Sequence, residues 1–200
     1  MSGGAMVTDP VLVDLPAEVV TPRLLLRPPQ AGDGAVLHEA ISESLPALRR
    51  FLASLPWVAG EHTVTSAEIY CRTSHASFLA RKELPFLMFE RESGALVGAA
   101  GLHRTVWATP RTEIGYWGRV SRWGQGFVTE AVGALAAYAF RHIGAVRIAM
   151  QLGRERQREF LTRLGLTRSS PIELPEVGAP MIPNPWRDIN SMTIAFGHGM

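Results

Sequence analysis

The sequence predicts one α/β (α+β) domain in which strands and helices alternate along the whole chain. One observation is size, because 200 residues, 46% of them hydrophobic, suit a single domain 1–200 with a substantial core. The other is periodicity, because short apolar alternations between turn residues are typical of strands and longer helical spacings of helices. Residues 1–10 are small and polar, and we expect them to be flexible.

The first part of the chain predicts two strands and then two helices. Apolar alternation predicts a short edge strand over 11–15, and prolines bound a second strand within 21–29. Apolar residues at helical spacing predict one helix from Asp33 and a separate one over 45–55.

A third helix and a hairpin are expected next. Thr65 or Ser66 provides a helix cap, and the helix reaches about residue 81. Its expected inward residues are Ile69, Phe78 and Leu79. Strands are then predicted over 86–91 and 96–104, because Glu92-Ser93-Gly94 between them is hairpin-turn chemistry.

The remainder predicts three strands, two helices and one long loop. Strands are expected over 112–118, 145–152 and 189–196, and helices over 127–142 and 155–164. Segment 169–186 contains five prolines, so we expect it to be a loop.

Composition indicates which partners are not expected and where in the cell the protein is expected. Twenty Lys+Arg against eighteen Asp+Glu leave a formal charge of +2, too slight to favour nucleic acid. No apolar run reaches the roughly 18–20 residues that span a bilayer, so no membrane partner is expected. Cys71 alone forms no intrachain disulfide, and with no secretory signal it favours the cytoplasm and an inert, partly buried thiol. The six histidines never pair at metal-ligand spacing, so no metal is expected.

The most informative stretch joins residues 113–118 of the predicted strand 112–118 to a glycine turn and a helix. Gly124 and Gly126 let the backbone approach a ligand, and the helix start offers free N–H groups and a positive dipole end. Such a turn suits a diphosphate, with Arg119 or Arg122 adding charge at its rim. For an isolated Gly-x-Gly, a simple tight turn is an equally good interpretation. A Rossmann site would follow the first strand of a βαβ pattern, and a Walker loop needs Gly-Lys-Ser/Thr, so neither fits.

Five segments, taken in order, resemble those of one family. They are Thr21-Pro-Arg-Leu-Leu-Leu-Arg-Pro, Ser44-Leu-Pro-Ala-Leu-Arg-Arg-Phe-Leu with Trp57, Leu96-Val-Gly-Ala-Ala-Gly-Leu, Glu113-Ile-Gly-Tyr-Trp and Gly124-Gln-Gly-Phe-Val-Thr-Glu-Ala. Over nearly its whole length the chain resembles the GNAT acetyltransferases, specifically the ribosomal-protein-alanine, or RimJ/RimL-like, branch.

The resemblance implies a GNAT fold: a mixed, mostly antiparallel, seven-stranded splayed sheet flanked by helices, with acetyl-CoA in the gap. It implies that the backbone of strand 113–117 pairs with the pantetheine arm and that turn 122–128 receives the diphosphate. The implied cofactor-binding residues are Ile114, Gly115, Tyr116, Trp117, Arg119, Arg122, Trp123, Gly124, Gln125, Gly126, Phe127 and Val128. Arg154 belongs to a basic run that is ordinarily a solvated helix face, and it is a further candidate to contact a CoA phosphate. The acceptor cleft is expected from 42–57, from the hairpin at 102–107 and from the loop after Gly165. Relatives often form homodimers.

Two positions depart from the family's pattern. Val128 stands where Ala or Gly is usual, and we expect it to tighten the phosphate pocket. Family members commonly carry Asn and Ser where this chain has Arg154 and Gln157. Glutamine cannot serve as an acid, so another group or water protonates the leaving thiolate, or the enzyme is weakened.

Acyl transfer to an amine requires a neutral amine, a polarised thioester carbonyl and a proton for the leaving thiolate. Glu113 is the first candidate to remove the amine's proton, through water, although a strand glutamate is more often an ion-pair partner. The resemblance adds Glu176 as a second candidate near the acceptor. Tyr116 is a candidate proton donor or a core aromatic. The candidate acceptor contacts are Trp57, His103 and Trp107.

The predicted function is transfer of an acetyl group from acetyl-CoA to a primary amine in a ternary complex. A protein or peptide N-terminal α-amine is the first candidate for the acceptor. The alternatives are a small-molecule amine such as a polyamine or aminoglycoside, another donor such as succinyl-CoA, and a non-catalytic acyl-CoA-binding protein on the same scaffold.

Overall fold

A mixed sheet organises the protein in the computed structural model, which describes residues 9–52, 58, 60–151 and 191–195. Within these residues the strands lie in the order β1 to β7, and only β5 and β6 pair in parallel. Six strands have four residues or more, and β1 has two. The strands are β1 (Val19–Val20), β2 (Leu24–Arg27), β3 (Leu84–Glu90), β4 (Leu96–Val106), β5 (Arg111–Gly118), β6 (Arg147–Gln151) and β7 (Ser191–Ala195). The predicted mixed, mostly antiparallel sheet flanked by helices is confirmed.

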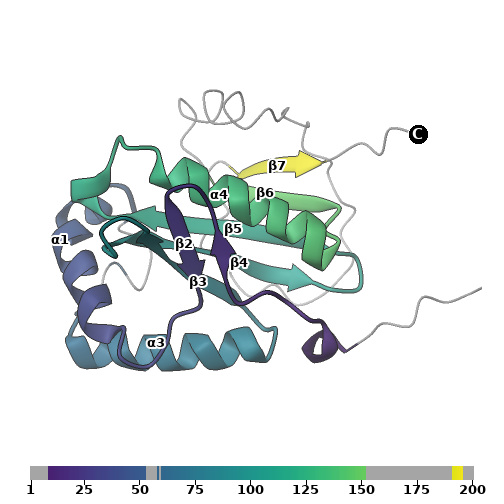
Figure 1. Ribbon diagram of the computed structural model, residues 1–200, viewed down its shortest axis with the longest axis horizontal. Coiled ribbons are helices and arrows are strands. Elements are labelled where there is room, and N and C mark those ends of the chain that lie inside the picture. Colours follow the sequence, from purple (N-terminus) through teal and green to yellow (C-terminus); the bar gives the residue numbers. More distant parts are fainter. Residues whose placement is uncertain (1–8, 53–57, 59, 152–190, 196–200) are drawn as a thin grey trace, which may run out of the picture.

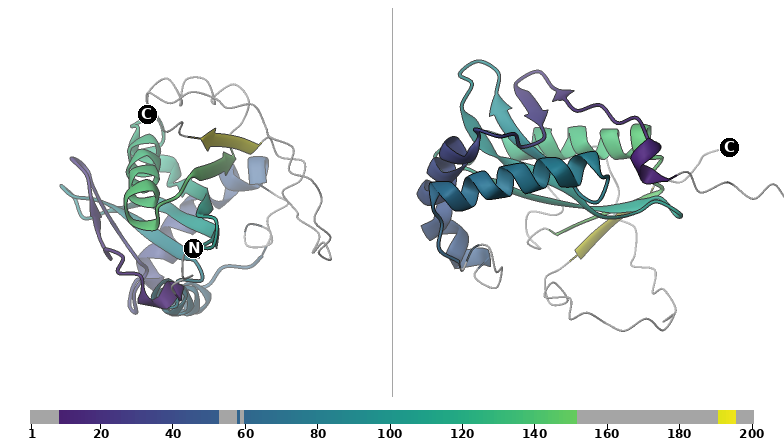
Figure 2. Two further views of the ribbon diagram at one scale, coloured as in Figure 1. Left: turned by 90° about the vertical axis from the view of Figure 1, so that its right-hand side faces the viewer. Right: turned by 90° about the horizontal axis from the view of Figure 1, so that it is seen from below.

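Helices cover both faces of the sheet (Figures 1 and 2). They are α1 (Gly34–Leu52), α3 (Val64–Leu79) and α4 (Phe127–Tyr138), with short turns at Pro10–Leu12, Val120–Arg122 and Ala139–Ile143. Most buried residues of α1 and α3 pack with Leu87 and Leu96 in one cluster, whereas Phe78 near the end of α3 packs in the main core. Those of α4 pack with Phe86 and Leu102 in the main core. Since Phe86 and Leu87 are neighbours on β3, they point to opposite faces, and the two clusters lie on opposite sides of the sheet.

The prediction of a strand over 11–15 is wrong. Pro10–Leu12 forms a turn of 3-10 helix, and the Asp9 side chain accepts a hydrogen bond from the Val11 N–H at 3.0 Å. Asp before Pro is a helix-start signal, since Asp caps free amides and Pro has no N–H to lose. This local chemistry outweighs a short apolar alternation.

The two helices predicted from Asp33 and over 45–55 form one continuous helix, α1, that passes through Pro46. A proline inside a helix costs about 3 kcal/mol. The apolar stripe runs on unbroken on both sides of it, with Ala40, Ile41 and Leu48 all buried. Burial of this stripe outweighs the proline.

The third predicted helix is present as α3, but its cap and its inward face differ from the prediction. Thr63 is the cap, and it exchanges hydrogen bonds with Ser66 in a capping box. Phe78 is buried as predicted, whereas Ile69 and Leu79 are 58% and 57% exposed. The buried face instead carries Ala67 and Cys71, which lie four residues apart on one side of the helix.

The predicted hairpin is confirmed as β3 and β4, and the strand over 112–118 as β5. The helix predicted over 127–142 is α4, which ends at Tyr138 and continues as a π turn to Ile143. Strands β6 and β7 lie within the segments predicted for them. Predictions for 155–164 and 169–186 lie outside the described residues.

Strand β5 is longer than the stretch it shares with β6. Its register with β4 reaches Gly118, whereas the described register with β6 runs only from Arg111 to Ile114. The Gly115–Trp117 end of β5 therefore extends past the described β6 pairs, and this end lines the pocket described below.

Three further properties bear on function. Among the described helices, none has the length and apolarity needed to cross a membrane. In the same residues no group of three or more His, Cys, Asp and Glu side chains is arranged to hold a metal. Cys71 is fully buried rather than partly buried, and burial raises the pKa of its thiol to about 12.

Candidate functional site

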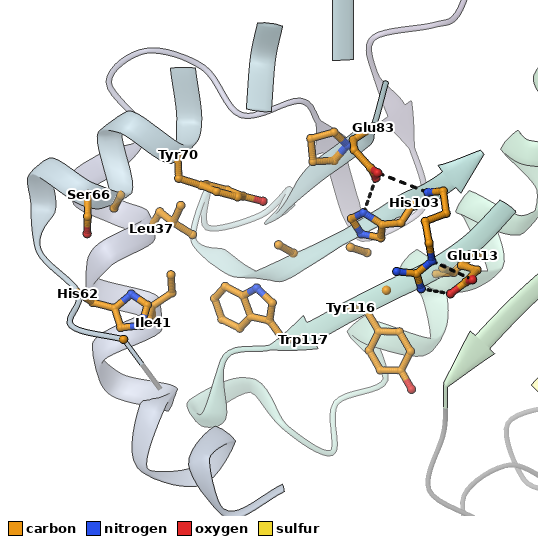
Figure 3. A pocket seen from close by; sticks show the side chains of 18 of the residues that line it. Leu37, Ile41, His62, Ser66, Tyr70, Glu83, His103, Glu113, Tyr116 and Trp117 are labelled. Carbon is orange, nitrogen blue, oxygen red and sulfur yellow. Dashed lines mark hydrogen bonds and ion pairs between the residues drawn. The ribbon is translucent and has the colours of Figure 1, made fainter. Parts of the chain in front are cut away.

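A pocket of about 630 Å³ lies between α1, α3 and the face of the sheet formed by β3, β4 and β5 (Figure 3). Leu37 and Ile41 of α1 and Trp117 of β5 form an apolar wall. Polar side chains gather at the other end, namely Glu83, His103, Arg104 and Glu113. The pocket thus has an apolar wall, near which His62 and Ser66 also lie, and a charged end (Figure 3).

Strand register explains which residues reach this pocket. Gly101 of β4 pairs with Gly115 of β5, and His103 pairs with Glu113. Side chains two apart on a strand share a face, so these four positions lie on the pocket side. Because neither glycine has a side chain, the floor between the two strands is open.

The His103 imidazole lies over that floor. Its Nδ1 is 2.7 Å from Oε2 of Glu83, just before β3, and the other Glu83 oxygen accepts from the Arg104 N–H at 3.4 Å. Burial raises the pKa of Glu83, but the hydrogen bonds and charges of His103 and Arg104 lower it by more, so the net pKa is below its usual value. His103 was predicted to contact the acceptor, whereas Glu83 was missed, because nothing in the sequence links it to a residue twenty positions later.

Glu113, the first candidate base, is ion-paired with Arg104. The guanidinium holds both carboxylate oxygens, with Nε donating to Oε1 at 2.9 Å and a second contact from Nη2 to Oε2. The hydrogen bond to Glu113 raises the pKa of Arg104. Arg104 has a φ of 50° at an irregularity in the β4–β5 register, which turns its side chain toward Glu113. Glu113 therefore forms an ion pair, which was the alternative to its role as a base.

The two aromatic residues of β5 belong to opposite faces. Trp117 packs beside the α1 and α3 cluster and lines the pocket. Tyr116, the candidate proton donor, packs against the main core, and Figure 3 shows its ring directed away from His103. Its position fits the core role better than proton donation inside this pocket.

The glycine turn follows β5 on its way into α4. Gly124 and Gly126 have φ values of 78° and 81°, which favour glycine, and Gly126 is the cap residue of α4 without a capping side chain. The first amides of a helix have no acceptor within it, so those of α4 are available to a ligand. A Cβ on Gly124 would meet nothing within 4 Å. The geometry fits an anion such as a diphosphate.

Neighbouring side chains hold the turn in place. Trp123 Nε1 donates to the Gly118 carbonyl at 2.8 Å, which fixes the turn to the end of β5. Val128 lies close enough that its Cγ2 would be 2.9 Å from a Cβ on Gly118. The Arg23 guanidinium donates to the Gln125 carbonyl at 2.9 Å. Arg23 was missed as a site residue, although it lies in the first of the five family-like segments.

The two arginines predicted at the phosphate rim are both ion-paired with carboxylates. Arg119 lies 2.6 Å from Glu39 and 2.6 Å from Glu43, so it links the turn to α1. Arg122 lies 3.3 Å from Glu90. Both guanidinium groups therefore already contact carboxylates.

Two further predicted residues that the structure describes, Trp107 and Phe127, do not line the pocket. Trp107 packs against the main core and donates its indole N–H to the Arg81 carbonyl at 3.3 Å, because the register shift after His103 turns the hairpin end. Phe127 is buried at the start of α4. Trp57, Arg154 and Glu176 lie outside the described residues.

A family model described as an acetyltransferase (GNAT) domain matches residues 23–167. The chain belongs to the GNAT acetyltransferase family. The predicted family, its acetyl-CoA-dependent class and the acetyl-CoA co-substrate are confirmed by this match.

Solved structures of similar fold include RimJ of Mycobacterium smegmatis in complex with a CoA disulfide, 24% identical, covering 86% of this chain and 81% of that one, with a TM-score of 0.64. An acetyltransferase from Salmonella typhimurium that modifies the N-terminal serine of ribosomal protein L7/L12 is 15% identical, covering 90% and 99%, with a TM-score of 0.67. The microcin C7 self-immunity acetyltransferase MccE, in complex with acetyl-CoA and AMP, is 16% identical, covering 88% and 93%, with a TM-score of 0.66. At these identities the likeness shows the fold.

One curated protein shares a shorter stretch. Over 64 residues, 30% of this chain, the sequence is 36% identical to the protein named Probable peptidoglycan D,D-transpeptidase FtsI of Caulobacter vibrioides. The chain spans 11% of that relative's length.

Proposed function

We propose that this protein transfers an acetyl group from acetyl-CoA to the primary α-amine at the N-terminus of a protein or peptide. The observation that carries the proposal is the start of α4, which has no capping side chain and directly follows Gly124 and Gly126. This helix start comes soon after the end of β5, a strand that also lines the pocket. In a GNAT domain this arrangement suits a CoA diphosphate on one side of β5 and an acceptor on the other.

The chain's own residues divide the work. Backbone amides at 124–128 hold the diphosphate, because a helix start combines free N–H groups with a positive dipole end. The Gly115–Trp117 end of β5 presents backbone groups to the pantetheine arm. Bound acetyl-CoA supplies the activated acyl group. The pocket under α1 and α3 holds the acceptor and excludes water from its apolar wall.

Three arguments support an α-amine as acceptor. A free α-amine has a reference pKa of about 7.7–8.0, so roughly 10–20% is neutral at pH 7, whereas a lysine near 10.4 is almost wholly charged. The Salmonella typhimurium neighbour that shares this fold is described as modifying the N-terminal serine of ribosomal protein L7/L12. The pocket's carboxylates, Glu61, Glu83 and Glu113, outnumber Arg104, which suits an acceptor that arrives as a cation.

The test is acetyl transfer by the full chain to a panel of unblocked peptides, spermidine and an aminoglycoside, each with acetyl-CoA. We expect CoA release and the mass gain of one acetyl group on peptides, with none on the same peptides blocked at the N-terminus. Transfer to blocked peptides through lysine, or to small amines only, would refute the α-amine assignment. Binding of CoA with no transfer to any acceptor would favour the non-catalytic alternative.

A further inference from the structure

Two glycines make room for the His103 ring on the sheet. A Cβ built on Gly101 would lie 3.0 Å from His103 Nε2, and one built on Gly115 would lie 3.1 Å from the same atom. Cβ atoms seldom approach other atoms so closely, so any side chain at either position would displace the imidazole. The paired glycines thus let Nε2 lie over β5, at the pocket floor.

The Glu83 carboxylate fixes the proton on the other ring nitrogen. An ionised carboxylate only accepts hydrogen bonds, so the Nδ1 atom 2.7 Å from it must carry the hydrogen. The lowered pKa of Glu83 keeps that carboxylate ionised at neutral pH. In the neutral imidazole the lone pair is therefore on Nε2, the atom directed toward Gly115.

The charges around the ring favour a positive guest. Glu83 approaches from the start of β3, and Arg104 and Glu113 come from β4 and β5. Two carboxylates and one guanidinium leave one net negative charge beside His103. The remaining titratable groups that line the pocket are Tyr116 of β5 and, from α3 and the segment before it, Glu61, His62 and Tyr70. This balance favours an ammonium group that enters the pocket.

We propose that His103 is the general base of the transfer and that Glu83 is its positioning residue. The proposal rests on the proposed function and deepens it, because it names the group that makes the acceptor nucleophilic. Both side chains are accessible, with 39% of His103 and 41% of Glu83 exposed. Glu113 is a poorer candidate, since each of its oxygens already accepts a hydrogen bond or ion pair from Arg104.

The proton balance is as follows. His103 Nε2 takes one proton from the acceptor ammonium and later releases it to solvent. The freed nitrogen lone pair forms the N–C bond to the acetyl carbonyl, and the C–S bond breaks with its electron pair on sulfur. The second amine proton is lost from nitrogen as the amide forms, and the leaving thiolate takes up one proton. Acetyl-CoA and an ammonium thus give an amide, CoA thiol and one proton.

The experiment compares His103→Gln with Glu113→Gln, using acetyl-CoA and an unblocked serine-initiated peptide at a series of pH values. We expect His103→Gln to lower kcat by about 10²- to 10⁴-fold, the range of general base catalysis, while its affinity for CoA stays that of the wild type. Glu113→Gln should lower kcat far less. The matched control is His142→Gln, because His142 lies against Tyr138 outside the pocket, and its rate should be unchanged.

Two further readouts separate a base from a structural residue. Free imidazole should restore turnover to His103→Ala in a saturable way, which a packing defect would not allow. Glu83→Gln should retain CoA binding but lower kcat, because a neutral amide holds the Nδ1–H of His103 less firmly than the carboxylate does.

The proposal fails if His103→Gln keeps wild-type kcat, or if Glu113→Gln alone abolishes it. Nitrogen NMR of the wild-type chain tests the geometry without any variant or turnover: neutral His103 should carry its hydrogen on Nδ1, and a hydrogen on Nε2 would overturn the assignment. Failure of the proposed function is distinguishable, since the wild type itself would then transfer nothing.

Discussion

Arg23 and Glu130, 107 residues apart, are joined at two points: the Arg23 N–H donates to Oε1 of Glu130 at 3.0 Å and its guanidinium Nε to Oε2 at 2.7 Å. The Thr21 hydroxyl donates to the same carboxylate at 2.6 Å, and the guanidinium lies 4.6 Å from the centroid of the Phe127 ring. The segment before β2 is thereby fixed to the first turn of α4, next to the glycine turn proposed to hold the diphosphate.

We predict that Glu130→Gln loosens this turn. Burial raises the pKa of Glu130, but its bonds to Thr21 and Arg23 lower it by more, so the carboxylate is ionised and its charge is lost in the variant. Because Arg23 is half exposed, the loss of stability should be about 1 kcal/mol. Calorimetric titration should show weaker binding of CoA, whereas Glu92→Gln in the exposed hairpin turn should bind as the wild type does. Unchanged CoA affinity in Glu130→Gln would show that the link does not support the turn.

The glycine turn can be tested with two variants of similar strain. Gly124 and Gly144 have φ values of 78° and 68°, and a Cβ on either would meet nothing within 4 Å. Alanine at either position should therefore cost about 1–2 kcal/mol of stability, from the left-handed backbone alone. Only Gly124→Ala should also weaken CoA binding, by about tenfold or more, because its backbone has to approach the diphosphate. Equal CoA affinities in the two variants would contradict a phosphate role for the turn.

Stability should fall in acid partly because of Asp33. Burial raises its pKa, but the Arg27 guanidinium at 2.7 Å and the Gln30 N–H lower it by more. A pKa that is lower in the folded state gives stabilisation that is complete above the unfolded value of about 3.9 and is lost as pH falls through the folded value. Urea unfolding at pH 7 and at an acidic pH well below 3.9 should show Asp33→Asn less stable than the wild type by about 2 kcal/mol at pH 7 and by less in acid. An equal difference at both pH values would contradict this linkage.

The Cys71 thiol should be inert in the folded protein. It is fully buried, and burial raises its pKa to about 12, so the reactive thiolate is almost absent at neutral pH. A thiol reagent should label the native chain slowly and the urea-unfolded chain at once. Rapid labelling of the native chain would mean that α3 opens from the sheet.

Local patterns predicted much of this fold. Apolar alternation and the Glu92-Ser93-Gly94 turn located β3 and β4, and the glycines before Phe127 located the start of α4. The α1 prediction failed because burial along the whole stripe outweighs Pro46, and the Ile69 prediction failed because apolar character alone does not say which face of α3 meets the sheet.

The candidate site was only partly predictable, because its parts come together through the sheet. His103 and the β5 segment were named from sequence, but Glu83 reaches His103 only through the pairing of β3 with β4. Likewise the partners of Arg119 come from α1, 76 and 80 positions earlier. Such long-range ion pairs depend on register and helix placement, which no local pattern encodes.

The central claim is that amides at the start of α4 hold the diphosphate of CoA, and calorimetric titration of the full chain tests it most directly. We expect CoA to bind at one site, in competition with acetyl-CoA, and 4′-phosphopantetheine, which lacks the diphosphate, to bind far more weakly. Absence of any heat with CoA, or equal affinity for the two ligands, would contradict the account.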